Sequence, residues 1–205
     1  MGKAARSGVR RHDAESITRI AFELFRERGY EATSVDQIAE RAGITKPAIY
    51  HHLSGKEAIL AAGVHEALDR LWELVPDEDD PLRPLDRLRK VVEESIAVEV
   101  RYLDQVAVLL RLKGNTPLER DILQRRRGFD LRVAAIVAAA MEDGDIRQDI
   151  NPRLVTRLIF GMLNWVTEWY RPGSHSLTEI VDAVLAIAFE GLAPERSPGG
   201  LHSPP

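Results

Sequence analysis

The chain has 205 residues, a formal net charge of −4 and a hydrophobic content of 44%, which suits a globular protein with one large or two small domains. It contains no cysteine, which excludes disulfides, thiolate metal sites and cysteine nucleophiles. The N-terminus lacks the apolar core of a signal peptide and no apolar run reaches the ~18 residues of a membrane span, so we expect a cytoplasmic protein without membrane contact.

Charge is distributed unevenly along the chain. Residues 1–56 carry ten Lys and Arg against seven Asp and Glu, a net +3, so the remainder carries −7. A basic N-terminal part and an acidic remainder indicate that the N-terminal part alone binds the phosphates of a nucleic acid. The chain opens with a basic arm, residues 1–11, expected to be flexible, which suits either an extra DNA contact or a solvated terminus. Its basic residues are Lys3, Arg6, Arg10 and Arg11.

The first three predicted helices are short and closely spaced. Apolar residues at i, i+3, i+4, i+7 and i+8 predict a helix over about 13–28, which Gly29 ends. Two more helices follow over about 34–41 and 45–52, with Gly43 between them. Two short helices joined by a tight glycine-containing turn are the sequence form of a helix-turn-helix, whose second helix enters the DNA major groove.

Helical periodicity continues through the rest of the chain. Ser54 and Glu57 form a capping-box pair that opens a helix reaching about Val75. The acidic, Pro-rich segment 76–84 is predicted to be a loop, and the tail 193–205, rich in Pro, Gly and Ser, to be disordered. No segment alternates with period two over strand length, so we predict an all-α fold of about nine helices. The further helices are predicted over about 84–113 (bent near 101–103), 116–143, 152–170 and 176–191.

Residues suited to DNA contact gather in the helix-turn-helix. A helix N-terminus at Thr33–Ser34 favours a phosphate, Lys46 and Lys56 can bind phosphates, and Tyr50 can donate to a phosphate or pack on a thymine methyl. The competing interpretation is a similarly shaped corner of an ordinary helical bundle. The predicted DNA-contacting set is Thr33, Ser34, Thr45, Lys46, Pro47, Ala48, Tyr50, His51, His52 and Lys56.

Six short stretches in the first 58 residues form a specific set. They are Ala21-Phe-Glu-Leu-Phe25, Arg28-Gly-Tyr30, Thr33-Ser-Val-Asp-Gln-Ile-Ala39, Ala42-Gly-Ile-Thr-Lys46, Ile49-Tyr-His-His52 and Ser54-Gly-Lys-Glu57. As a set they resemble the N-terminal domain of TetR/AcrR-type transcriptional regulators, with Leu53 in place of the usual Phe. The resemblance implies a DNA-binding domain over 12–58, with its motif over 33–52, and a helical ligand-binding and dimerisation domain over 59–192.

The same resemblance implies a homodimer on a palindromic double-stranded DNA operator, and most such proteins are repressors that a small molecule releases. In family members the last two helices form the dimer interface, and the apolar stripes of the two C-terminal helices suit that role. Packing within one monomer is the alternative use of these stripes. The predicted dimer residues are Leu154, Leu158, Gly161, Trp165, Trp169, Ile180, Val184 and Ile187.

The helix near Asn164 resembles that of TetR-family repressors that respond to acyl-CoA thioesters. Arg125, Arg126 and Arg127 suit the CoA phosphates, although no more than two consecutive arginines can face one ligand. Another small apolar or aromatic effector, or no effector, remains an alternative. The predicted ligand residues are Tyr102, Gln105, Arg126, Phe129, Phe160, Asn164 and Glu168. An apolar tunnel for the acyl chain is predicted among Val106, Leu109, Leu110, Phe129, Val133, Phe160 and Leu163.

No catalytic signature is found in the sequence. It has no Gly-rich phosphate loop, nucleophile elbow or paired-carboxylate pattern. His51 and His52 are adjacent, so they point to different sides of a helix, and the other histidines lack ligand spacing. We therefore expect no catalytic residues, no metal and no cofactor. A helical binding protein without operator recognition and a helical enzyme are the alternative classes.

Overall fold

The computed structural model describes residues 13–77 and 80–191. Over these residues the chain forms nine α-helices and no strand, which confirms the all-α prediction. The predicted basic arm (1–11) and C-terminal tail (193–205) lie outside the described residues. The helices are α1 (Ala14–Arg28), α2 (Val35–Ala42), α3 (Lys46–His52), α4 (Lys56–Glu73), α5 (Pro84–Arg101), α6 (Leu103–Arg111), α7 (Pro117–Glu142), α8 (Pro152–Trp169) and α9 (Leu177–Phe189).

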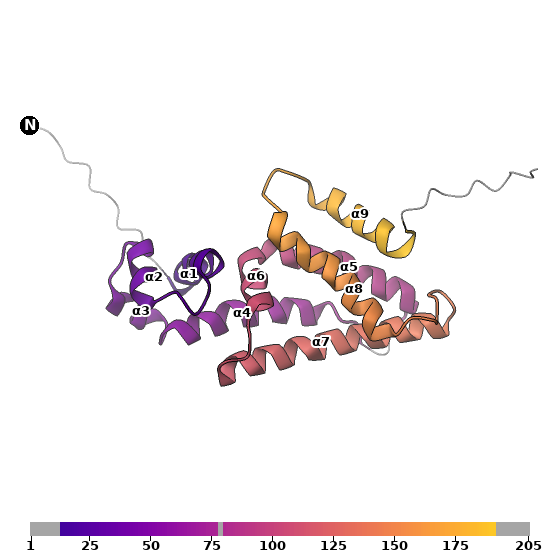
Figure 1. The fold of residues 1–205 in the computed structure, drawn as a ribbon, viewed down its shortest axis with the longest axis horizontal. Coiled ribbons are helices and arrows are strands. Elements are labelled where there is room, and N and C mark those ends of the chain that lie inside the picture. The colour runs from indigo at the N-terminus through magenta and orange to yellow at the C-terminus, as the bar shows by residue number, and fades with distance from the viewer. Residues whose placement is uncertain (1–12, 78–79, 192–205) are drawn as a thin grey trace, which may run out of the picture.

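Helices α1–α3 form a small head at one end of the molecule (Figure 1). Their apolar faces meet around Phe22 and Phe25, whose rings pack edge to face with centroids 5.4 Å apart. Gly43 ends α2 in the left-handed conformation, with φ 68° and ψ 29°, which permits the sharp reversal into α3. Ile38 from α2 and Ile49 from α3 are fully buried, so packing in the head stabilises helices that are too short to form alone.

Helix α4 leads from the head into a bundle of α5–α9 (Figure 1). It packs against α1 on one side and against α5, α6 and α7 farther along. At the α1 contact, a Cβ atom on Gly63 would overlap the Phe22 ring, so glycine is needed for this close approach. The long helix α7 contacts α4, α5 and α8, while α9 lies on α5 and α8. One continuous apolar core includes residues from both head and bundle, so α4 is shared between them.

Helix boundaries follow the predicted signals closely, with differences in capping. The bend predicted near 101–103 is confirmed, because α5 ends at Arg101 and α6 begins at Leu103. The capping box expected from Ser54 and Glu57 is absent: Gly55 is the N-cap of α4 and no side chain caps this end. Its φ of 138° is a backbone conformation that favours glycine, which moves the helix start past Ser54.

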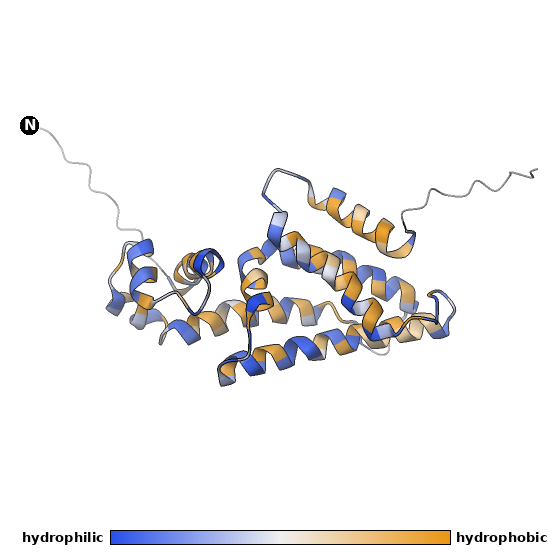
Figure 2. Cartoon of the chain, viewed as in Figure 1, coloured by the Kyte–Doolittle hydropathy of each residue, from blue (hydrophilic) through white to orange (hydrophobic). Residues whose placement is uncertain are grey.

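The bundle presents an apolar surface along α8 and α9. Figure 2 shows hydrophobic residues along much of α9, yet its buried residues are Ile180 and Val181 alone. On α8, Leu158 is 60% exposed and Trp165 is 66% exposed. Over the part of the chain that the structure describes, no helix combines the length and apolar character that a membrane crossing requires.

Candidate nucleic-acid interface and effector pocket

Helix α3 presents a polar and aromatic outer face. Its one buried residue, Ile49, holds it against the head, while Tyr50 is 50% exposed. Thr45 is the N-cap of α3, but its side chain makes no capping hydrogen bond. The predicted α3 residues Lys46, Pro47, His51 and His52 are exposed, as is Thr45, and Ala48 is half-buried. The exposed residues share one short helix held to the head from behind, which is the arrangement a recognition helix requires.

Two predicted phosphate-binding residues have other roles in this structure. Thr33 is 2% exposed, and its hydroxyl donates to the carbonyl of Gly29 at 2.8 Å. The Lys56 ammonium donates to the carbonyls of Tyr30 (3.0 Å) and Glu31 (3.3 Å), and it lies over the Tyr30 ring. Both side chains therefore stabilise the connection between α1 and α2 in the free protein, and a DNA contact by either residue stays a prediction.

Ser34 and Lys46 remain accessible but are already hydrogen-bonded. The Ser34 hydroxyl accepts from the backbone N–H of Gln37 at 3.2 Å, and the Gln37 side chain accepts from Ser34 N–H at 2.8 Å, which together form a capping box. Lys46 lies 2.8 Å from the carboxylate of Asp36, and this hydrogen bond raises the pKa of Lys46. Because both side chains of the pair are exposed, a DNA phosphate can compete for Lys46.

A small cavity lies at the centre of the bundle, between α4 and α8. Its volume is about 20 Å³, close to the space of a single water molecule. A drug-sized ligand needs roughly 300 Å³ or more, so the predicted apolar tunnel is filled by side chains in this structure. The lining residues are Leu68, Leu71, Glu99, Val106, Leu109, Leu110, Arg126, Phe129, Asp130, Phe160 and Asn164.

Charged groups converge on this apolar cavity. Glu99 of α5 is 2% exposed, and burial raises the pKa of its carboxyl to about 8, while the charge of Arg126 acts in the opposite direction. Burial also raises the pKa of Asp130, against the charges of Arg126 and Arg157. The side chain of Asn164 completes the polar part of the lining. Such convergence of polar groups in an apolar pocket is typical of a ligand site.

The predicted ligand residues divide into two groups. Arg126, Phe129, Phe160 and Asn164 line the cavity together. Tyr102 and Gln105 do not, because the chain turns between α5 and α6 and directs them toward α1 and α4. Glu168 is exposed and pairs with Arg111 at 3.0 Å, one turn beyond Asn164. Tyr102, Gln105 and Glu168 therefore do not join the other four predicted ligand residues at this cavity.

Two residues of the predicted tunnel and two of the three consecutive arginines do not line the cavity. Val133 and Leu163 are fully buried in the main core and do not line the cavity. Arg125 forms an ion pair with Asp69, and Arg127 is exposed. Of the three consecutive arginines, Arg126 alone lines the cavity, so this site offers one guanidinium rather than a cluster.

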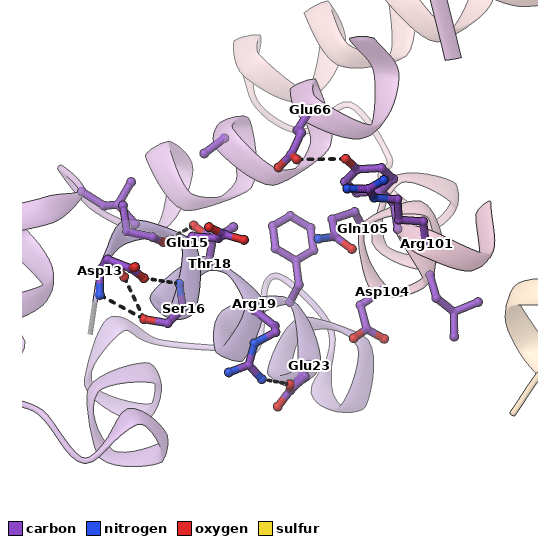
Figure 3. A pocket seen from close by; sticks show the side chains of 16 residues that line it. Asp13, Glu15, Ser16, Thr18, Arg19, Glu23, Glu66, Arg101, Asp104 and Gln105 are labelled. Carbon is purple, nitrogen blue, oxygen red and sulfur yellow. Dashed lines mark hydrogen bonds and ion pairs between the residues drawn. The ribbon is translucent and has the colours of Figure 1, made fainter. Parts of the chain in front are cut away.

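Tyr102 and Gln105 line a separate, open cleft of about 680 Å³ between the head and the bundle (Figure 3). The Tyr102 hydroxyl donates to Glu66 at 2.9 Å, and Arg19 pairs with Glu23 on the α1 wall. Acidic residues outnumber arginines in its lining, which makes the cleft unsuited to DNA phosphates. The cleft is lined by residues of α1, α4 and α6.

Arg26 links the head to the helices around the cavity. Its guanidinium lies 2.8 Å from Asp104 of α6 and donates to the carbonyl of Thr167 of α8 at 3.0 Å. Arg111 of α6 donates in turn to the Arg26 carbonyl at 3.1 Å. A displacement of α6 or α8 therefore acts on α1 directly, through charged hydrogen bonds. Sequence reasoning missed these contacts, which join residues more than 70 positions apart.

The predicted dimer residues of α8 lie along one exposed face. Leu154 is 47% exposed, Leu158 60%, Trp165 66% and Trp169 41%, and Gly161 between them is also exposed. On α9, Ile187 is exposed and Val184 half-buried, whereas Ile180 is 6% exposed and packs within the monomer. An exposed apolar stripe of this extent is typical of a protein interface.

Glu99 is the pocket residue that sequence reasoning missed. It follows Leu88, Val92 and Ser95 on the buried face of α5, so the signal was a charged residue inside an apolar stripe. Asp130, one turn after Arg126 on α7, is a second lining residue that the sequence prediction did not include. Among the described residues, no group of three or more His, Asp or Glu side chains could hold a metal ion.

Comparison with known proteins assigns the chain to a family. Residues 17–62 match the family described as "Bacterial regulatory proteins, tetR family", and residues 81–192 match "Tetracyclin repressor-like, C-terminal domain". The HTH-type transcriptional repressor KstR2 of Rhodococcus jostii (strain RHA1) is 30% identical over 183 residues, covering 85% of this chain and 88% of the relative.

Solved structures agree with this assignment. A TetR-family regulator from Streptomyces coelicolor A3 has a TM-score of 0.81 and 43% identity, covering 87% of this chain and 91% of that one. AibR in complex with isovaleryl coenzyme A and operator DNA has a TM-score of 0.73 and 26% identity, covering 86% and 97%. The helix-turn-helix head, the helical C-terminal half and these matches together show that the chain belongs to the TetR family of transcriptional regulators.

Proposed function

We propose that this protein is a repressor that binds a palindromic operator as a homodimer and dissociates when a small molecule fills the cavity between α4 and α8. The observation that supports DNA binding is the exposed face of α3. Tyr50 on that face is half exposed, while Ile49 is buried and holds the helix to the head. The exposed stripe on α8 supports the dimer. Similar proteins are named transcriptional repressors, which supports the direction of regulation.

An acyl-CoA thioester is the leading effector. AibR, 26% identical to this chain, is described in complex with isovaleryl coenzyme A and operator DNA. The cavity supports this choice because apolar side chains from α4, α6, α7 and α8 surround it and Arg126 supplies a guanidinium. A thioester needs both an apolar wall and hydrogen-bond donors.

A different small apolar or aromatic effector is the second candidate. It is favoured by the placement of Arg125 and Arg127, because both lie outside the cavity and leave it poor in cations for the several phosphates of CoA. Such an effector would use the same walls without a phosphate-binding rim.

Release would follow from movement of α4. Leu68 and Leu71 of α4 line the cavity, so a ligand that expands it would press on α4, and α4 contacts the head at Phe22 and Gly63. The two heads of a dimer must lie about one DNA turn, ~34 Å, apart to reach successive major grooves. A ligand that prefers the expanded cavity therefore favours a spacing that the operator does not accept.

The experiment is fluorescence anisotropy of labelled duplexes from the promoters of this gene and its neighbours, with and without octanoyl-CoA. We expect salt-dependent binding to a palindromic fragment and its reversal by the thioester. Failure to bind any such duplex at low salt would contradict the repressor proposal. Binding that the thioester leaves unchanged, but that an aromatic acid reverses, would favour the second candidate.

A further inference from the structure

One buried acid in the central cavity has an unpaired oxygen. The Glu99 side chain is 2% exposed, and its Oε2 atom has no hydrogen-bond partner. It projects from α5 into a lining that α4 and α6 make apolar, through Leu68, Leu71 and the α6 residues Val106, Leu109 and Leu110. A buried polar atom without a partner is unfavourable, so this oxygen is suited to bind a group that enters the cavity.

The charges around Glu99 restrict what that group can be. Arg126 of α7 lines the cavity and opposes a cationic ligand. Asp130, one turn later on α7, opposes an anionic ligand, and Arg157 of α8 acts mainly on Asp130. The other α8 groups in the lining, Phe160 and Asn164, do not titrate. An uncharged polar group is therefore the best match to this lining.

Protonation makes Glu99 a hydrogen-bond donor at neutral pH. Burial raises the pKa of Glu99 to about 8, with Arg126 opposing this shift, so the carboxyl carries its proton below that pH. A protonated carboxyl has one O–H donor, and a guanidinium has donors only. Two donors in an apolar cavity are complementary to a single acceptor oxygen.

We propose that Glu99 and Arg126 together recognise a carbonyl-type oxygen, as in a thioester, ester or ketone, on an uncharged apolar group of the effector. This inference deepens the proposed function and rests on it for the location of the site. Glu99 is then a specificity-determining residue that selects the oxygen, while the Leu and Phe walls select the apolar part.

The test uses isothermal titration calorimetry with three probes. They are octanoyl-CoA, the N-acetylcysteamine thioester of octanoate, and the matching octyl thioether, which lacks the carbonyl oxygen. Wild-type protein should bind the short thioester roughly tenfold more tightly than the thioether at pH 6.5, the difference expected for one buried hydrogen bond. This comparison needs no variant, so it does not depend on a substitution that folds.

The variants then assign the effect to Glu99. Glu99→Leu should lose the preference for thioester over thioether, whereas Glu99→Gln, which keeps an N–H donor, should retain it. Affinity of wild-type protein for the thioester should fall about tenfold from pH 6.5 to pH 9 as Glu99 ionises, and affinity of Glu99→Gln should stay nearly constant.

The outcomes separate this inference from the proposed function. If octanoyl-CoA and both short probes bind wild type and Glu99→Leu equally at both pH values, the role of Glu99 is overturned and the acyl effector stands. If the short thioester shows the Glu99-dependent preference while octanoyl-CoA does not bind, the role of Glu99 stands and the CoA effector is overturned. Absence of binding by all three probes to the wild type overturns both.

Discussion

The head and the bundle place their polar residues in opposite ways. On α3 the polar and aromatic side chains point outward, and the buried contact is Ile49. Around the central cavity the charged side chains point inward, and Glu99 is 2% exposed. An outward polar face is solvated in the free protein, so it can serve a partner without reducing stability. An inward polar group affects folding and binding together.

This difference implies that substitutions will separate the two regions. Changes to the outer surfaces of α3 and α8 should alter binding or assembly while leaving the folded monomer intact. Changes at Glu99 should alter stability, and they should do so in a pH-dependent manner. The four experiments below test that contrast, from the largest expected effect to the smallest.

Trp165→Glu should break the proposed dimer. Trp165 is 66% exposed on the α8 stripe, and a symmetric interface contains it twice. A central tryptophan contributes at least ~2 kcal/mol, so we expect a loss of about 4 kcal/mol, roughly a thousandfold in the dimer dissociation constant. Sedimentation velocity measures the shift to monomer. The matched control is Leu131→Glu on α7, where Leu131 is 51% exposed, and this variant should remain dimeric. If both variants have the same dimer dissociation constant, the proposed interface on α8 is wrong.

Glu99→Gln should make stability less dependent on pH. Folding raises the pKa of Glu99 from 4.5 to about 8, so the folded state holds this proton more tightly than the unfolded state. The contribution of Glu99 to the free energy of unfolding is therefore fully present below pH 4.5 and is lost as the pH rises toward 8. In urea unfolding, the free energy of unfolding of the wild type should fall by about 2–4 kcal/mol between pH 5 and pH 8, since one pKa unit is about 1.4 kcal/mol. The variant should not show this fall. Parallel pH profiles for the two proteins would refute the protonated state.

Tyr50→Ala should weaken operator binding without changing the dimer or the effector site. One base or phosphate contact is worth about 1–3 kcal/mol, and the operator receives it from both heads, so affinity should fall roughly a hundredfold. Anisotropy with the operator duplex measures it. Tyr50→Phe removes the hydroxyl alone and distinguishes donation to a phosphate from packing on a thymine methyl. An Ala variant with wild-type affinity would exclude Tyr50 from the interface.

Arg26 and Asp104 should show a modest coupling energy in the free energy of unfolding. The two side chains are 25% and 28% exposed, and Arg26 also bonds the Thr167 carbonyl. A double-mutant cycle of Arg26→Ala and Asp104→Ala should give about 1 kcal/mol in unfolding free energy. The cycle of Arg19→Ala and Glu23→Ala, an exposed pair on the same helix α1, should give about 0.3 kcal/mol. Equal coupling in both cycles would mean that Arg26 does not specifically join the head to the bundle.

The sequence predicted the head better than the cavity for a physical reason. Gly43, Ser34 with Gln37, and the apolar residues of α1 act over a few positions, so periodicity and capping identify them. The cavity depends on which faces of five helices meet. Tyr102 and Glu168 do not line this cavity, because Tyr102 follows the turn between α5 and α6 and bonds Glu66, and Glu168 pairs with Arg111.

Tertiary contacts also determine the roles of polar side chains within the head. Lys56 is basic and lies close to the recognition helix in sequence, which suggests a phosphate contact. The structure directs its ammonium to the carbonyls of Tyr30 and Glu31, 26 and 25 residues earlier in the chain. Gly55 likewise replaces Ser54 as the N-cap of α4. A local pattern identifies the helix, while the neighbouring elements decide which polar side chains remain accessible.

The small size of the central cavity has a consequence for the speed of the response. Because about 20 Å³ is far below the roughly 300 Å³ of a site for a drug-sized ligand, an effector that uses this cavity, as proposed, must bind a more open conformation of the bundle. Opening then precedes binding or accompanies it, and the apparent affinity is reduced by the fraction of molecules that are open. In stopped-flow mixing, the observed association rate should level off at high effector concentration, at a value equal to the opening rate. Substitutions that enlarge the cavity, such as Leu68→Ala, should raise that plateau, so the packing of α4 would determine how quickly the repressor responds.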